Sequence, residues 1–177
     1  LHKLEALQNS QIPFQDYLNA LRIDLQGKLA VSLDRLNNYQ AARYFRQENI
    51  RIAKSSGFEQ KLINEYFSLA YIYAALGQYP AAKRYYEYSK EIAITLGRDR
   101  EYIALNDLNI GQMHRKMGNP QLAWDIHQEI AANVTFEKYK YFESVLQFEL
   151  LNDAMALGNY AEVKRIGEAI LADERPV

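Results

Sequence analysis

One short pattern occurs four times along the chain, and its regular spacing constrains the fold more than any other feature. Each copy has a large apolar residue, then Gly or Asn, and Tyr or Pro two residues further on. The intervals between successive copies are 40, 41 and 40 residues. Near-equal intervals of this length are typical of arrays of one repeated supersecondary unit. The Gly or Asn positions that mark the four copies are Asn37, Gly77, Gly118 and Gly158.

The residues around each mark predict two helices joined by a tight turn. Gly adopts the left-handed conformation that follows a helix C-terminus at no steric cost, and Asn is the next best residue there. Pro80 and Pro120 follow two of the turns, just inside the next helix, where a missing N–H costs nothing. On both sides of the turns, apolar residues recur with the period of an α-helix rather than that of a strand. The first helix of the second copy shows this face clearly, at Tyr66, Leu69, Ala70, Tyr73 and Leu76.

Stop signals between the copies set the expected boundaries of the repeats. Gly57 and Gly97 end the first two copies, whereas the connection near Asn133 has no Gly. The opening helix is expected to run from Phe14 to Leu36. Residues 1–13 are expected to be the last helix of a truncated preceding repeat, which gives about nine helices in total. The predicted single domain, residues 1–177, then contains four hairpin repeats at 14–57, 58–98, 99–136 and 137–173.

This pattern resembles the tetratricopeptide repeat (TPR) superfamily over residues 15–173. The family's usual period is 34 residues, and the longer period of about 40 found here is similar to that of bacterial regulators: sensor segments of diguanylate cyclases and histidine kinases, LuxR-type activators and peptide-pheromone receptors. The resemblance implies an all-α fold, a right-handed α-α superhelix, and non-catalytic binding of proteins or peptides. The second copy carries the motif most completely, at Tyr66, Leu69, Ala70, Tyr73, Gly77, Tyr79, Ala82, Tyr86 and Ser89.

The other copies depart from the family pattern at some positions. In the third copy His114 and His127 stand where aromatic residues are usual, and in the fourth Leu151 and Val163 replace small residues. Small residues are needed where the two helices of a pair cross at about 8–10 Å. The positions expected to meet this requirement on the second helices are Ala42, Ala82 and Ala123.

The composition excludes several classes of site. The chain has no Cys, and therefore no disulfide, thiol nucleophile, Cys-type zinc finger or iron–sulfur cluster. Glycine-rich nucleotide motifs and the GxSxG nucleophile motif do not occur. We therefore expect no enzyme activity, no cofactor and no metal. The absence of Cys leaves the compartment open between cytoplasm and periplasm.

Charge and hydropathy argue against nucleic acid and membrane partners. The 21 basic and 22 acidic residues nearly balance, whereas a surface for phosphates or anionic lipids needs a basic excess or stripe. Arg43, Arg46 and Arg51 are close together in the sequence, and we expect them to form a basic outer face balanced by acids elsewhere. No apolar run approaches the roughly 18–20 residues that cross a bilayer, so we expect no direct membrane insertion.

Two of the three histidines fall in the third copy, where they are expected to face each other across the helix pair. One interpretation is a proton-transfer or metal pair. The other is a polar replacement of two core aromatics, with His114 and His127 hydrogen-bonded to each other or to Gln112 or Asn106. The second is favoured because HExxH spacing is absent and a zinc site needs three or four ligands.

Stacked helix pairs curl so that their first helices line an inner wall, and this wall is the predicted binding surface. On these helices the stripe opposite the core face is apolar, aromatic or amide-bearing, where a solvated face would be charged. Amides pair with both the N–H and the C=O of an extended peptide, and Arg115 is expected to take a carboxylate. The candidate groove residues are Asn64, Phe67, Tyr71, Leu108, Gln112, Arg115, Phe148 and Asn152.

An alternative for this stripe stays open: its aromatic residues pack within a tightly wound superhelix or against a flanking domain. The two-carboxylate clamp of chaperone-binding TPR proteins is not expected, because Gly27 and Val31 stand where that clamp requires Lys and Asn.

The sequence therefore predicts a sensor module that binds a protein, a peptide or a small ligand and acts on a covalently linked output domain. The larger protein would be a diguanylate cyclase, a histidine kinase or a transcription regulator. The alternative function is a static scaffold that docks the subunits of an assembly through other surfaces.

Overall fold

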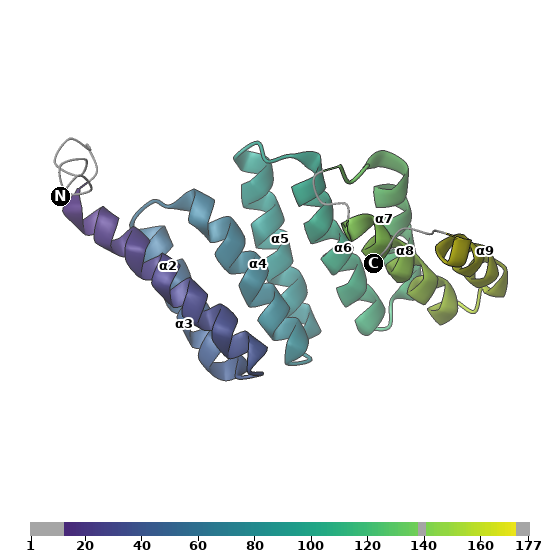
Figure 1. The fold of residues 1–177 in the computed structure, drawn as a ribbon, viewed down its shortest axis with the longest axis horizontal. Coiled ribbons are helices and arrows are strands. Elements are labelled where there is room, and N and C mark those ends of the chain that lie inside the picture. The colour runs from purple at the N-terminus through teal and green to yellow at the C-terminus, as the bar shows by residue number, and fades with distance from the viewer. Residues whose placement is uncertain (1–12, 138–140, 173–177) are drawn as a thin grey trace.

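The computed structural model describes residues 13–137 and 141–172, and these residues form helices and turns without a strand. Figure 1 shows the helices side by side in chain order, from α2 at one end to α9 at the other. The helix expected in residues 1–13 lies outside the described part of the chain. The helices are α2 (Phe14–Arg35), α3 (Tyr39–Ser55), α4 (Glu59–Ala75), α5 (Tyr79–Thr95), α6 (Arg100–Lys116), α7 (Pro120–Asn133), α8 (Tyr141–Ala156) and α9 (Tyr160–Ala172).

The turns within the hairpins share one hydrogen-bonded geometry. After α4, Gly77 has φ +72°, and its N–H donates to the Ala74 carbonyl while the Gln78 N–H donates to the Tyr73 carbonyl. Asn37 takes the same place after α2, with φ +57°. This paired motif satisfies carbonyls that the helix end leaves without partners. The sequence pattern of Gly or Asn at a 40-residue interval therefore records a backbone requirement.

Close approach of the paired helices follows from small residues that face each other. Ala30 of α2 and Ala42 of α3 belong to one buried cluster, and Ala70 of α4 and Ala82 of α5 belong to another. Each of these four residues is at most 1% exposed. Ala123 of α7 is likewise fully buried, so the crossing positions expected from the sequence are where the helices meet.

Stacking is local along the chain, because each helix contacts its neighbours in sequence. Among helices two apart in chain order, α6 and α8 make the most extensive contact. Both are first helices of their hairpins, so the first helices lie on the inner side of the stack. We call the side of α2, α4, α6 and α8 the inner side, and the side of α3, α5 and α7 the outer side.

The connection after the third hairpin differs from the others, as the missing glycine suggested. Helix α7 ends at Asn133, and the next residue, Val134, is extended with φ −129° and ψ 126°. Phe136 then turns into the core, where it is 3% exposed and packs with residues of α6 and α8. A buried aromatic side chain anchors this connection in place of a left-handed turn residue.

The register of the hairpins can be tested at the crossing of α4 and α5. Replacing Ala82 by Trp puts a large ring where a fully buried methyl group now lies. We expect the free energy of unfolding to fall by about 1–3 kcal/mol or more, the cost of overpacking a tight core. Chemical denaturation monitored by circular dichroism measures this change.

The matched control is Glu91→Trp on the exposed side of the same helix, where the change should stay within about 0.5 kcal/mol. Equal midpoints for the two variants would show that Ala82 does not hold the crossing.

Candidate binding groove

A groove opens on the inner side between α2 and α4. It consists of two adjoining hollows of about 480 and 140 Å³, which share Val31, Arg46 and Ser68. We call them together the inner groove. Its walls come from the two first helices, and its floor comes from Arg46 of the second helix α3. The wall residues used below are Asp24, Gly27, Val31 and Asp34 on α2, and Asn64, Phe67, Ser68 and Tyr71 on α4.

The floor of the inner groove is a buried ion pair. Arg46 and Glu65 have side chains 9% and 7% exposed, and Arg46 Nη1 lies 3.1 Å from both carboxylate oxygens. Burial raises the pKa of Glu65. The charge and the hydrogen bond of Arg46, and the hydrogen bond of Asn49, act in the opposite direction. Arg46 Nε has no hydrogen-bond partner among the described residues. This buried N–H is therefore left without an acceptor within the described part of the chain, which is costly for a buried polar group.

Arg46 corrects an expectation from the sequence. It was expected on a basic outer face with Arg43 and Arg51, but it is 7% exposed and points inward to Glu65. The other two arginines do lie near outer side chains: the Arg43 guanidinium is 5.9 Å from the Tyr73 ring centroid, and Arg51 pairs with Glu48. Sequence spacing on the helix could not identify the buried partner, because Glu65 lies on another helix.

One end of the inner groove is acidic and aromatic. Asp34 and Tyr71 face the smaller hollow from opposite walls. Burial raises the pKa of Asp34, with the nearby Arg46 charge opposing it. Burial also raises the pKa of Tyr71, and the Asp34 carboxylate adds to this effect. The lining therefore mixes both charge signs with a phenol, an amide and a hydroxyl, a composition suited to a polypeptide rather than to a polyanion.

Three of the predicted groove residues line this opening. Asn64 is exposed in the larger hollow, and Tyr71, 49% exposed, borders the smaller one. Phe67 also borders the smaller hollow, but its ring packs edge-on to Tyr86 with centroids 5.2 Å apart. It therefore contributes to the core between α4 and α5 as well as to the groove wall.

The inner side is closed further along the chain, where α8 packs on α6. Leu108 is 1% exposed, in a cluster with Leu146 and Leu150 of α8. The expectation that Leu108 lines an open groove was wrong, because the α6–α8 contact covers it. Gln112 is half-buried, whereas Phe148 and Asn152 of α8 are exposed.

Arg115 is also engaged within the chain. Its guanidinium binds Glu149 and, at 2.5 Å, Asp153 Oδ1, both on α8. The sequence predicted that Arg115 would take a carboxylate of a ligand in the groove, but two carboxylates of the next repeat occupy it. Desolvation lowers the pKa of Arg115, and its bonds to Glu149 and Asp153 raise it, with a net upward shift. The ion pairs therefore tie α6 to α8 and help to close the groove here.

Asp153 continues this network to a buried histidine. His127 and Asp153 are both 0% exposed, and His127 Nδ1 lies 2.5 Å from Asp153 Oδ2. The other ring nitrogen, Nε2, donates to the Leu108 carbonyl at 2.9 Å. Since a carbonyl only accepts, Nε2 carries a proton.

The expected pairing of His127 with His114, Gln112 or Asn106 was therefore wrong. Both nitrogens of His127 are used by Asp153 and Leu108, and the partner lies on α8, which spacing within the third repeat did not reveal. Burial and the charge of Lys83 lower the pKa of His114. His127 is a polar replacement of a core aromatic, as the second interpretation proposed, but its hydrogen-bond partners are Asp153 and Leu108.

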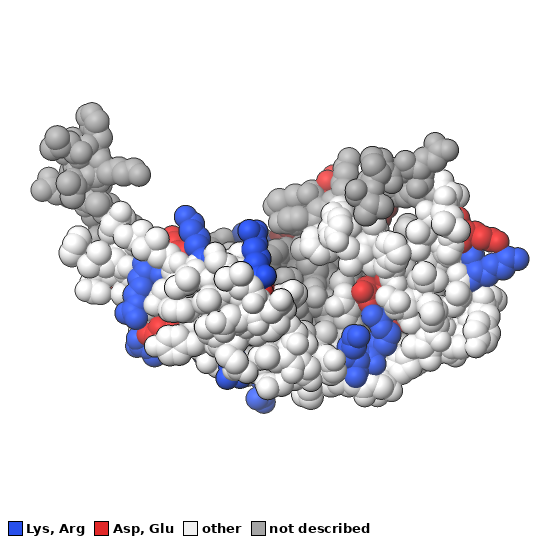
Figure 2. Space-filling model, turned by 60° about the horizontal axis from the view of Figure 1, so that its bottom comes forward, with Lys and Arg blue, Asp and Glu red and all other residues white. Residues whose placement is uncertain are grey.

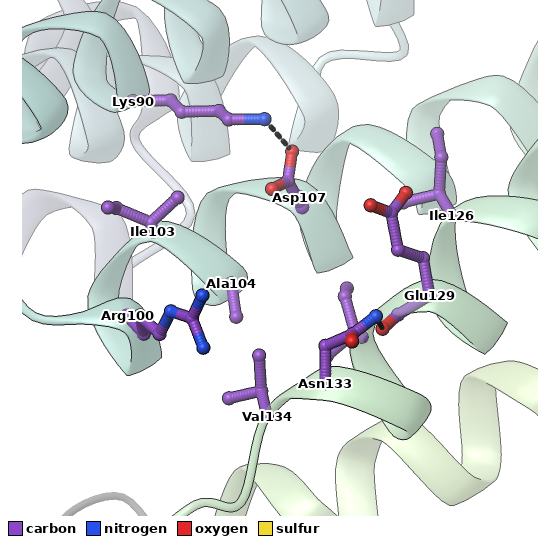
Figure 3. Close-up of a pocket in the computed structure, with 10 residues that line it drawn as sticks. Lys90, Arg100, Ile103, Ala104, Asp107, Ile126, Glu129, Asn133 and Val134 are labelled. Carbon is purple, nitrogen blue, oxygen red and sulfur yellow. Dashed lines mark hydrogen bonds and ion pairs between the residues drawn. The ribbon is translucent and has the colours of Figure 1, made fainter.

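A separate hollow of about 640 Å³ lies on the outer side, between α5 and α7 with α6 beneath. We call it the outer pocket. Figure 3 shows Lys90 of α5 donating to Asp107 of α6, at 2.6 Å, above the apolar side chains of Ile103 and Ala104. This pocket was not predicted from the sequence, although several residues that line it occupy equivalent positions of the repeats.

Charged side chains are spread over the surface. Figure 2 shows lysine and arginine in small separate groups on the face drawn, several with acidic residues beside them. Within residues 13–137 and 141–172, no group of three or more His, Asp or Glu residues is arranged to hold a metal ion. No helix of the described part is long and apolar enough to cross a membrane.

Comparison with known proteins identifies the fold. No protein-family model and no curated protein matches the sequence. BtubC (BKLC) from P. vanneervenii matches with a TM-score of 0.72 at 20% identity, over 96% of this chain and 71% of that one. A putative kinesin light chain from Podosopora anserina with nearly identical TPR-like repeats gives 0.69 at 19%, over 99% and 86%. The N-terminal domain of stress-induced protein-1 from C. elegans gives 0.52 at 14%, over 82% and 92%.

The fold is of the TPR type. The predicted all-α, right-handed superhelix is confirmed, with eight helices in the described residues where about nine were expected for the whole chain. The second helices of the first three hairpins each carry a buried side chain at one equivalent position. These side chains differ in chemistry: Arg46, Tyr86 and His127. Arg46 pairs with Glu65 of the following helix, Tyr86 packs on Phe67 of the preceding helix, and His127 bonds to Asp153 of the following helix. The same fold therefore accommodates different contacts between its helices.

The buried histidine imposes a requirement on the helix beneath it. A Cβ placed on Gly111 would lie 2.4 Å from His127 Nε2, and the imidazole is held by bonds at both nitrogens. In an open helix, Gly→Ala gains up to about 1 kcal/mol. Here we expect Gly111→Ala to lower the free energy of unfolding by about 1–3 kcal/mol, because overpacking outweighs the helix propensity.

Gly167→Ala in α9 provides the matched control, since a Cβ there meets nothing within 4 Å. It should raise the free energy of unfolding by about 0.5–1 kcal/mol. Urea denaturation of both variants measures the contrast, and a stabilised Gly111→Ala protein would contradict the tight fit around His127.

Proposed function

We propose that this chain is a non-catalytic interaction module that holds an extended segment of a partner protein in the inner groove. The observation that supports this most is the opening between α2 and α4, with Asn64 and Tyr71 on its wall and Arg46 at its floor. Proteins of the TPR type present first-helix side chains on their inner side, and stacked repeats provide long surfaces for such binding.

The lining supports a peptide rather than a nucleic acid or a small anion. The Asn64 amide offers both a donor and an acceptor to a peptide backbone. Asp24 is already paired with Lys61 at 2.5 Å. The rim of the groove therefore carries charges of both signs rather than of one sign. Val31 and Tyr71 supply apolar surface between these polar groups.

We further propose that binding regulates a covalently linked output domain, as in bacterial signalling proteins. The period of about 40 residues supports this assignment, as does the contrast between the open α2–α4 junction and the closed α6–α8 junction. A segment bound between α2 and α4 would draw these helices together and change the curvature of the stack, which each repeat transmits to its neighbour.

A static scaffold is the second candidate function. It is supported by the outer pocket, which lies away from the inner groove and offers another surface for protein contact. A scaffold that docks through the outer side would bind its partner with the inner groove unchanged. The two candidates therefore differ in which surface a substitution must alter to weaken binding.

Tyr71 is the residue that best tests the inner groove. We expect Tyr71→Ala to weaken binding of a peptide, selected from a display library against the whole chain, by about tenfold or more, the effect of removing a central aromatic contact. Asn64→Ala should weaken it in the same direction. Isothermal titration calorimetry measures both dissociation constants, and Phe67 is unsuitable because its ring also packs on Tyr86.

The matched control is Tyr44→Ala on α3, whose ring is 62% exposed and outside the inner groove. It should leave the affinity unchanged. If Tyr44→Ala weakened binding while Tyr71→Ala and Asn64→Ala did not, the peptide would bind on the outer side and the scaffold would be the better assignment.

A further inference from the structure

The space between the second helices α3 and α5, above α4, is filled by tyrosine rings. Ring centroids of Tyr66 and Tyr85 are 5.9 Å apart, those of Tyr73 and Tyr85 are 5.1 Å apart, and those of Tyr66 and Tyr88 are 5.5 Å apart. Lys54 of α3 lies over the cluster, with Nζ 5.7 Å from the Tyr66 centroid. The chain itself therefore uses stacked phenol rings beneath a cation to close this space.

The outer pocket is the same space one repeat later, without the tyrosines. Helix α4 begins at Glu59 and α6 at Arg100, so equivalent positions in these two repeats are 41 residues apart. Three of the four tyrosine positions fall on the pocket lining, and none of the three holds an aromatic residue. The hollow of about 640 Å³ lies at these three positions. The replacements are Tyr66 by Asp107, Tyr85 by Ile126 and Tyr88 by Glu129.

The remaining lining is apolar inside and charged at the rim. Ile103, Ile126 and Ile130 provide aliphatic surface. Above it lie the ion pair of Lys90 with Asp107 and the side chains of Arg100 and Glu129, which Figure 3 shows directed toward the space between the helices. Volumes of this order accommodate groups up to the size of a drug molecule.

We propose that the outer pocket binds a tyrosine side chain of a partner protein. A phenol ring would occupy part of the space that the preceding repeat fills with its own tyrosines. Its face would meet the Lys90 and Arg100 cations, as the Tyr66 ring meets Lys54. Its hydroxyl would donate to the carboxylate of Asp107 or Glu129, the arrangement that a half-buried tyrosine needs.

An aliphatic side chain suits this pocket less well. It would cover the charged side chains at the rim without donating a hydrogen bond to the carboxylates of Asp107 or Glu129. Burying charged groups without such a bond is costly. The outer pocket shares no lining residue with the inner groove. The tyrosine site therefore lies on a second surface and does not depend on the peptide groove, and it names a ligand for the outer side through which the alternative scaffold would dock.

The proposal is tested by titrating the methyl-labelled whole chain with N-acetyl-tyrosinamide in two-dimensional NMR. The methyl signals of Ile103, Ala104 and Ile130 should shift saturably with a millimolar dissociation constant, while those of Ala30 and Ile72 near the inner groove should not move. N-acetyl-leucinamide should bind roughly tenfold more weakly, the value of one hydrogen bond to a charged acceptor.

Two variants that restore the missing ring should abolish the saturable shifts. Asp107→Tyr and Glu129→Tyr each place a tyrosine where the preceding repeat has Tyr66 or Tyr88. Glu129 is exposed, so its variant keeps the test valid if Asp107→Tyr does not fold. Asp125→Tyr, on the exposed surface of α7 outside the pocket, is the matched control and should bind the probe like the wild type.

Three results would overturn the proposal: absence of saturable shifts at the pocket methyls, equal affinity for the leucine probe, or unchanged tyrosine binding by a folded Glu129→Tyr variant. Loss of peptide binding at the inner groove would have no bearing on it, because the two surfaces are probed by different residues.

Discussion

The structure depends on how closely the two helices of each hairpin approach each other. Fully buried small residues set this distance, with Ala30 facing Ala42 and Ala70 facing Ala82. Because these contacts leave no space for a larger side chain, the first two hairpins are built in the same way. The junctions between hairpins differ from one another, and they generate the inner groove, its closed continuation and the outer pocket.

One helix position illustrates how similar hairpins support different junctions. Arg46, Tyr86 and His127 occupy equivalent sites on successive second helices, and all are buried. Tyr86 packs on Phe67 of its own hairpin, whereas Arg46 and His127 reach acidic residues of the following first helix. The buried Arg46 requires its partner to be present, because an unpaired buried charge is costly. This requirement ties the second hairpin to the first.

The sequence predicted the elements that depend on local chemistry. Turn positions followed from Gly or Asn at a 40-residue interval, and Asn37 and Gly77 do adopt positive φ. Helical periodicity predicted that Asn64 and Tyr71 lie on the inner side of the stack. Contacts between repeats could not be predicted in this way. The burial of Leu108 and the engagement of Arg115 both depend on how closely α8 approaches α6, a distance set by packing across many residues rather than by any local signal.

The ion pairs between α6 and α8 have a mechanical consequence. Arg115 holds two carboxylates of the following helix. Between the first two hairpins, Arg46 with Glu65 and Lys61 with Asp24 do the same beside the open hollow. Pulling the ends of the stack apart would therefore load charged contacts at both junctions, so both ends would resist extension through the same kind of interaction.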